Sequence, residues 1–129
     1  MSWWGDGPMT LPLTDFLLAR IAEDEVAIRR ASMFPPRWVA RPDDVGQPII
    51  AGSFRVATCA ESVMDHIARH DPARVLAECE AKRRVVEMQW HHLGEDDYAW
   101  GMEEAKRQIL AELALPYADH PDYREEWRP

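Results

Sequence analysis

Two histidines four positions apart are the first residues in this sequence whose type and spacing suit a chemical role. His66 and His70 occur in the stretch 66-HIARHDPARVL-76. On a helix, residues four apart share a face and differ by about 6 Å in rise, so both imidazoles would reach one ion. Imidazole is a common ligand of divalent transition metals, but two ligands do not complete a site. The metal hypothesis therefore needs a further ligand, for which His91 or His92, or an acid such as Glu78 or Asp65, is the candidate.

The same stretch also reads as a boundary between two helices. Asp71 is a good N-cap and Pro72 fits the first position of a helix, so a new helix is predicted to begin there. His70 would then end the preceding helix, where a histidine is favoured beside the last carbonyl groups. The zinc-protease pattern H-E-x-x-H fails, because Ile67 stands where the glutamate would be. The boundary is the preferred interpretation, and the metal site is kept as the alternative.

Hydrophobic periodicity predicts a mainly helical α+β fold with four main helices. A small antiparallel hairpin or meander is expected between the first and second helices, because short strand-like runs alternate there with turn residues. Thr58, followed three residues later by Glu61, is predicted to cap the second helix, and Asp122 to cap a short C-terminal helix. The predicted helices cover 12–32, 58–70, 72–93 and 97–115, and the predicted strands 37–41, 48–51 and 54–57.

The length of 129 residues predicts a single domain, 1–129. Residues 1–10 are expected to be a loose tail, and residues 116–129 a C-terminal tail that holds the short helix. The predicted core side chains fall at helical spacing. On the first, third and fourth helices they are Leu13, Phe16, Leu17, Leu18, Ile21, Ile28, Val75, Leu76, Cys79, Val86, Trp90, Leu93, Trp100, Ile109, Leu110, Leu113 and Ala114.

Composition narrows the classes of partner and the expected location. The net charge of −8 argues against nucleic-acid binding, since contacts to phosphates supply most of that affinity. No apolar run is long enough to cross a membrane, and the start of the chain lacks the features of a signal peptide. Cys59 and Cys79 are interpreted as reduced thiols. A cytoplasmic protein without membrane contact is expected.

The sequence contains no recognisable motif that supplies a complete set of catalytic residues. There is no G-x-S-x-G motif and no glycine-rich phosphate loop. Cys59 lies near a predicted helix N-terminus, which favours a reactive thiol, but no partner for it is recognisable. The basic run 82-KRR-84 is interleaved with glutamates, which is typical of a solvated mixed-charge face. No catalytic residue and no cofactor other than the hypothetical divalent transition metal is assigned. The patterns favour a protein that is not an enzyme but leave the question open.

Aromatic residues near the two ends of the chain are candidates for partner binding. Trp3, Trp4, Tyr123 and Trp127 lie in segments too short to form a core of their own. They would either dock onto the body of the protein or serve as anchors for a partner, a role in which tryptophan is favoured. Both alternatives stay open at this point.

Three stretches of the sequence are 17-LLARIAEDE-25, 63-VMDHIARHDPARVLAECEAKRRVVE-87 and 112-ELALPYADHPDYREEWRP-129. Together they resemble a small uncharacterised protein family of actinobacteria and their phages. The family has no assigned activity, so the resemblance implies a setting, a cytoplasmic accessory protein, and no site residues. Together with the amphipathic helices, it favours an accessory or regulatory protein that acts through a protein partner or self-association. The alternative is a metal-binding protein or metal-dependent enzyme centred on His66 and His70.

Overall fold

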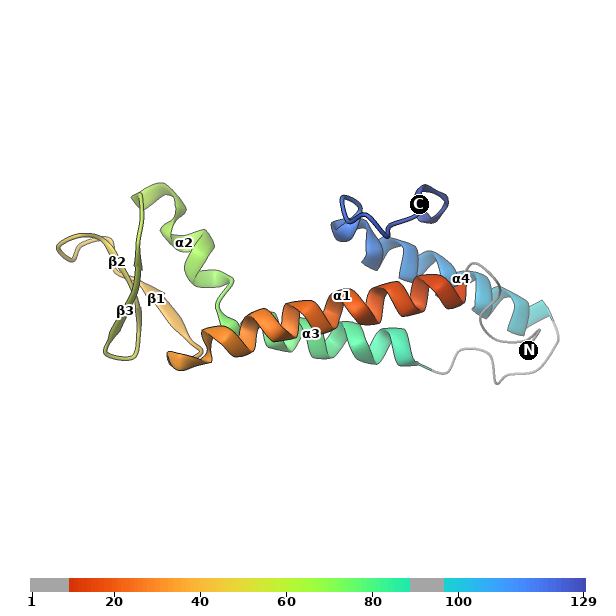
Figure 1. Ribbon diagram of the computed structural model, residues 1–129, viewed down its shortest axis with the longest axis horizontal. Helices are drawn as coiled ribbons and strands as arrows, with labels where there is room; N and C mark the ends of the chain where they lie inside the picture. Colours follow the sequence, from red (N-terminus) through yellow and green to blue (C-terminus); the bar gives the residue numbers. More distant parts are fainter. Residues whose placement is uncertain (1–9, 89–96) are drawn as a thin grey trace. The chain divides into compact units, whose positions relative to one another are not determined.

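The computed structural model describes residues 10–88 and 97–129 (Figure 1). The chain divides into two compact units, residues 1–22 with 82–129 (the first unit) and residues 23–81 (the second unit). Each unit is described by itself, and that they form a single domain stays a prediction. The helices are α1 (Thr10–Arg30), α2 (Glu61–Arg69), α3 (Pro72–Glu87) and α4 (Asp97–Ala114); the strands are β1 (Trp38–Ala40), β2 (Pro48–Ala51) and β3 (Phe54–Thr58); the short 3₁₀ turns are η1 (Ala31–Met33), η2 (Leu115–Tyr117) and η3 (Glu125–Trp127).

The predicted fold class is confirmed. Four helices are present, and a three-stranded antiparallel sheet lies between α1 and α2 in the order β1-β2-β3. The predicted extension of the third helix to Leu93 lies outside the described residues, since α3 is described only to Glu87. Among the described residues, no helix is both long enough and apolar enough to cross a membrane.

The core of the first unit is built on one stripe of α1. Leu13, Leu17 and Ile21 are spaced four apart and fully buried. This spacing places them on one side of the helix, where burial of each large apolar side chain contributes about 1.5–3 kcal/mol. The other buried apolar side chains of the unit are Phe16, Val86, Leu110, Ala111, Ala114 and Trp127. The prediction for Ile109 is wrong, because this side chain is 38% exposed, and so is the prediction for Leu76 of the second unit, which is 40% exposed.

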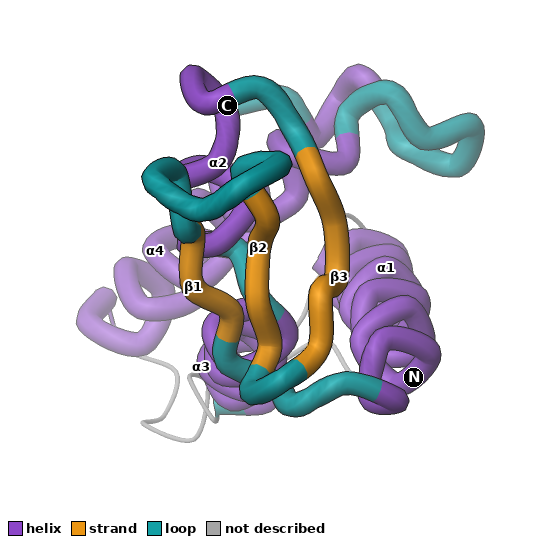
Figure 2. Tube along the Cα trace, turned by 90° about the vertical axis from the view of Figure 1, so that its left-hand side faces the viewer, coloured by secondary structure: helices purple, strands orange, loops and turns teal. Residues whose placement is uncertain are grey.

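The core of the second unit lies on one face of the sheet. Ile49 and Ala51 of β2 are fully buried, as is Met64 of α2. Figure 2 shows the sheet in front, with α2 behind it. Gly52 takes a φ of +61° in the turn between β2 and β3, a conformation that glycine adopts without steric cost. An added Cβ at Gly52 would also lie 3.1 Å from Pro35, so the turn packs closely on the segment after α1.

Two predicted helix caps are wrong. Thr58 is the last residue of β3 and pairs with Pro48, so α2 begins only at Glu61, after Ala60, without a side-chain cap. Asp122 does not cap η3, which begins after Arg124. Instead, the backbone N–H of Asp122 donates to His120 Nδ1 at 3.0 Å. In both places strand pairing or a turn uses the residue that the local pattern assigned to a cap.

Candidate functional site

His66 and His70 lie together at the end of α2. Their ring centroids are 4.5 Å apart. His70 Nδ1 donates to the carbonyl oxygen of His66 at 2.7 Å, so this nitrogen carries the hydrogen and Nε2 is left with the lone pair. The backbone N–H of His70 also reaches the carbonyls of His66 and Ile67. The prediction that His70 closes the helix at its last carbonyls is confirmed.

A third metal ligand for this pair is not found in the described part of the chain. No group of three or more His, Cys, Asp or Glu side chains within residues 10–88 and 97–129 could hold a metal ion. His91 and His92, the proposed additional ligands, lie outside the described residues. The described residues therefore offer two imidazoles on one exposed helix end, half of what a closed zinc site requires.

Asp71 connects the helix boundary to the sheet of the second unit. Its Oδ1 accepts the backbone N–H of Arg74 at 2.9 Å, which confirms the predicted N-cap of α3. Its Oδ2 accepts the backbone N–H of Trp38 at 3.0 Å. A second link runs in parallel, from the backbone N–H of Ala73 to the carbonyl of Pro36 at 3.0 Å. One buried carboxylate thus fixes the start of α3 against the start of β1.

A shallow pocket of about 220 Å³ adjoins this joint in the second unit. His70 lies on its edge, and Trp38 forms part of its wall. Trp38 Nε1 donates to the carbonyl of Pro35 at 3.2 Å, so the indole is held and is not left to bind a ligand. The other lining residues are Asp24, Ala27, Ile28, Ala31, Pro72 and Val75. The pocket is small, open and mostly apolar, which suits no particular chemistry.

The C-terminal aromatic residues pack onto α1 in the first unit. The ring of Phe16 lies 5.1 Å from Trp127, 5.9 Å from Tyr123 and 5.6 Å from His120, measured between ring centroids. Edge-to-face and tilted pairs at these distances are favourable beyond the area they bury. Trp127 is only 4% exposed, so it docks onto the body of the protein. Tyr123 is half-buried beside it.

Arg20 adds a polar link between α1 and the same C-terminal segment. Its Nη1 lies 2.6 Å from Nε2 and 2.9 Å from Nδ1 of His120. Arginine has donors only, so the imidazole must supply the lone pair. The same guanidinium lies 5.1 Å from the Phe16 ring centroid and 3.9 Å from the Asp122 carboxylate. The proposed partner residues Trp3 and Trp4 lie outside the described residues.

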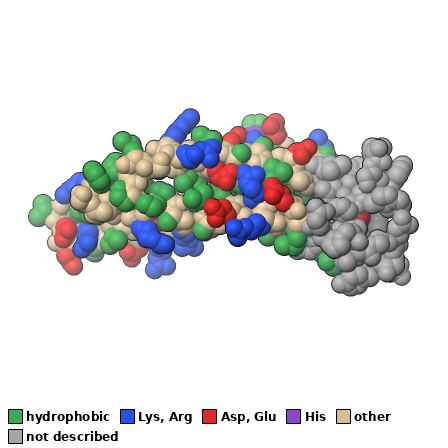
Figure 3. Space-filling view, turned by 90° about the horizontal axis from the view of Figure 1, so that it is seen from below, with side chains coloured by type: hydrophobic (Ala, Val, Ile, Leu, Met, Phe, Trp, Pro, Cys, Tyr) green, Lys and Arg blue, Asp and Glu red, His purple; other side chains and the backbone are tan. Residues whose placement is uncertain are grey.

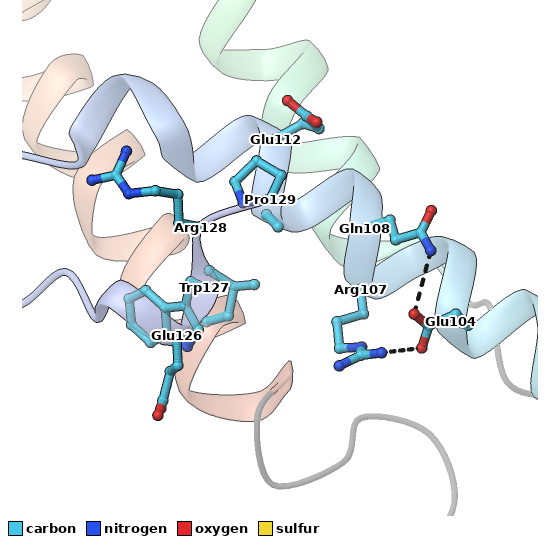
Figure 4. A pocket seen from close by; sticks show the side chains of 10 residues that line it. Glu104, Arg107, Gln108, Glu112, Glu126, Trp127, Arg128 and Pro129 are labelled. Atoms are coloured by element: carbon cyan, nitrogen blue, oxygen red, sulfur yellow. Dashed lines mark hydrogen bonds and ion pairs between the residues drawn. The ribbon is translucent and has the colours of Figure 1, made fainter.

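A larger pocket, of about 380 Å³, lies between α4 and the C-terminal residues of the first unit (Figure 4). Figure 4 shows Glu104, Arg107 and Gln108 of α4 on one side and Trp127 and its neighbours on the other. The volume lies within the range of small-molecule sites. The charged side chains in its lining are Glu104, Arg107, Glu112, Glu126 and Arg128.

Most of these charges are engaged with one another or with neighbours. Arg107 and Gln108 hydrogen-bond to Glu104 and lower the pKa of its carboxyl group. Arg128 hydrogen-bonds to Glu125, which lowers the pKa of Glu125 and raises that of Arg128. Exposed pairs of this kind contribute little to stability. The pocket therefore has a suitable size but few polar groups left for a ligand.

Two arginines of α3 have glutamate partners on the same helix, whereas Lys82 of the basic run lies 3.4 Å from the hydroxyl of Tyr117. Arg83 pairs with Glu87 at 3.9 Å, and Arg74 pairs with Glu78 at 3.0 Å, both at i,i+4 spacing. Figure 3 shows acidic and basic side chains interleaved on the face that it displays. This arrangement agrees with a solvated mixed-charge helix face.

A surface that the sequence reasoning missed lies on the outer face of the sheet in the second unit. The side chains along 37–41 alternate between exposed and half-buried, so Arg37, Val39 and Arg41 point outward. Val39 pairs with Ile50 and Ile50 with Arg55, and directly paired residues share a face. We call these five residues the arginine face. The signal was present in the alternation of 37-RWVAR-41, which the sequence reasoning interpreted only as a strand.

Comparison with known proteins identifies the family of the chain but assigns it no function. Neither a curated protein nor a solved structure matches it. A family model described as a family of unknown function, DUF6221, matches residues 10–129. This match covers all of the described residues and includes the three stretches on which the sequence resemblance rests. The chain belongs to the DUF6221 family.

Proposed function

We propose that this protein is a small cytoplasmic accessory or regulatory protein, of actinobacterial or actinophage type, that acts by binding another protein or a second copy of itself. The supporting observation is the set of large apolar side chains left exposed around the sheet. Val39 is 52% exposed, Phe54 51% and Met33 78%. Val39 pairs with Ile50 and Phe54 with Ala51, so the two side chains lie on opposite faces of the sheet. Exposed large apolar side chains of this kind are candidates for contact sites.

The exposed side chains are placed on a rigid support. Phe54 packs against Phe34 with ring centroids 5.9 Å apart, and Val39 lies in a strand paired to β2. The sheet is held to α3 through Asp71. A surface that is ordered before binding loses less conformational entropy when a partner docks, which favours recognition.

A quantitative pull-down tests this proposal. Tagged wild-type protein and a Val39→Ser/Phe54→Ser variant would be incubated with isotope-labelled actinobacterial lysate and compared by mass spectrometry. We expect one or a few proteins, or the chain itself, to be depleted at least several-fold with the variant. Val26→Ser is the matched control, since Val26 is also exposed but lies on α1. Identical recovery with wild type and the double variant, both folded by circular dichroism, would refute the proposal.

A second candidate function is metal binding at His66 and His70. The observation that favours it is the 4.5 Å separation of the two rings at one exposed helix end. Close to one equivalent of a transition metal in gently purified full-length protein, lost in the His66→Ala/His70→Ala variant, would support this function. Metal-free protein that also fails to bind added Zn²⁺ or Ni²⁺ in calorimetry would eliminate it.

A further inference from the structure

We infer that the arginine face binds an acidic segment of a partner protein, one that carries apolar residues among its carboxylates. The inference rests on the proposed function and names its surface and the chemistry of the partner. The proposed function rests on exposed apolar side chains, whereas this inference depends on the charges and the geometry of the sheet.

Geometry places three cations around two apolar side chains on the arginine face. Arg37 and Arg41 lie two positions before and after Val39, and the backbone N–H of Arg41 continues the ladder by donating to Pro48 at 3.0 Å. Arg55 stands across the sheet, in register with Ile50. Its Nη1 lies near the turn between β1 and β2, 2.9 Å from where a Cβ on Gly46 would be. The arginines thus flank Val39 and Ile50.

The charge of this region is opposite to that of the chain. Residues 31–58, which include the whole sheet, contain three arginines and two aspartates, for a net charge of +1. Because the whole chain carries −8, the remaining residues carry −9. The two aspartates, Asp43 and Asp44, lie in the turn between β1 and β2, the turn that Arg55 Nη1 approaches, but neither forms an ion pair with an arginine of the arginine face. A positive area on an acidic protein steers negatively charged partners to that area and away from the rest.

The cations of the arginine face are also unengaged. Within the part of the chain that the structure describes, neither Arg37, Arg41 nor Arg55 forms an ion pair. By contrast, four arginines on the helices and in the C-terminal segment are paired with glutamates: Arg74, Arg107, Arg124 and Arg128. A guanidinium without a partner keeps its donors for a carboxylate, which it binds in a fork geometry.

Val39 and Ile50, the apolar pair of the arginine face, favour an acidic protein segment over another polyanion as the ligand. Arginine beside apolar side chains is typical of protein interfaces. A nucleic acid gains its affinity from many phosphate contacts, and the acidic remainder of the chain would repel its long backbone. A short acidic segment avoids that repulsion, because it need not extend beyond the sheet. Val39 and Ile50 would pack against the apolar residues of such a segment.

Fluorescence anisotropy with three labelled probes tests the inference. The probes are a short peptide rich in glutamate and leucine, a single-stranded oligothymidine, and phosphatidylserine vesicles. We expect the peptide to bind most tightly, and an Arg37→Gln/Arg41→Gln/Arg55→Gln variant to weaken it about tenfold, as the loss of three exposed ion pairs would. Val39→Ser should weaken peptide binding and leave any oligothymidine binding unchanged.

An Arg29→Gln/Arg30→Gln variant is the matched control, because these exposed arginines lie at the end of α1, outside the arginine face. It should bind the peptide like the wild type. Peptide binding that is absent, or that survives the triple variant, overturns the inference, as does tighter binding of oligothymidine or vesicles. If the triple variant nevertheless captures the partner that the Val39→Ser/Phe54→Ser variant loses, the proposed function stands while this inference fails.

Discussion

The carboxylate of Asp71 accepts a hydrogen bond of 3.0 Å from the backbone N–H of Trp38, 33 positions earlier in the chain. The same carboxylate caps α3 through Arg74. Asp71 is buried, so both donors would lose a partner that water does not readily replace. This one side chain links the boundary between α2 and α3 to the first strand of the sheet that carries the arginine face.

Replacing Asp71 should therefore destabilise the protein more than loss of a surface acid. We expect Asp71→Ala to lower the free energy of unfolding by about 1–3 kcal/mol, since it removes a cap and leaves the Trp38 amide unpaired. Asp71→Asn keeps one acceptor oxygen and should cost less. Urea denaturation followed by far-UV circular dichroism measures both. Asp65→Ala, at an exposed position of α2, is the control, and an Asp71→Ala variant no less stable than this control would contradict the assigned role.

Trp127 should stabilise the first unit through its contact with Phe16. Its ring is almost fully buried, so Trp127→Ala is expected to lower the free energy of unfolding by about 3–5 kcal/mol, a typical cost for truncating a buried aromatic side chain. Trp127→Phe keeps an aromatic ring near Phe16 and should lower the free energy of unfolding by clearly less. The same urea titration measures the difference. Equal stability of Trp127→Ala and wild type would show that the C-terminal segment is not docked in solution.

The ion pair between Glu125 and Arg128 predicts a pH dependence with a definite sign. Hydrogen bonding by Arg128 lowers the pKa of Glu125, so the pair stabilises the folded form above the ordinary glutamate pKa and is lost as the pH falls through the lowered value. An NMR titration of the side-chain carboxyl should show that Arg128→Ala raises the pKa of Glu125 toward its usual value. Arg107→Ala should instead raise the pKa of Glu104. A Glu125 pKa unaffected by Arg128→Ala would contradict the pairing.

Local sequence patterns predicted what local interactions decide. The four helices and the antiparallel sheet follow from periodicity and turn residues, and Asp71-Pro72 and His70 act at the helix boundary as their positions indicated. Thr58 misled the prediction because strand pairing with Pro48 took a residue that also fits a capping pattern. A cap motif carries no information about a competing ladder elsewhere in the chain.

Long-range relationships were beyond the reach of the sequence. Nothing near Asp71 indicates that its second oxygen binds Trp38, and nothing near Phe16 indicates that it contacts Tyr123 and Trp127, because these pairs form only when distant segments pack. The arginine face is an intermediate case. The alternation around Val39 was readable, but the pairing that adds Arg55 was not.

Chemical-shift mapping of the labelled full-length protein is the most direct test of recognition by the sheet. Titrating in the glutamate- and leucine-rich peptide should shift the amide signals of Val39, Ile50 and Arg55, which lie in one row across β1, β2 and β3. The shifts should weaken as salt is added, since exposed charges are screened. Shifts confined to residues outside the sheet, or no shifts at a peptide concentration that saturates anisotropy, would contradict binding at the arginine face.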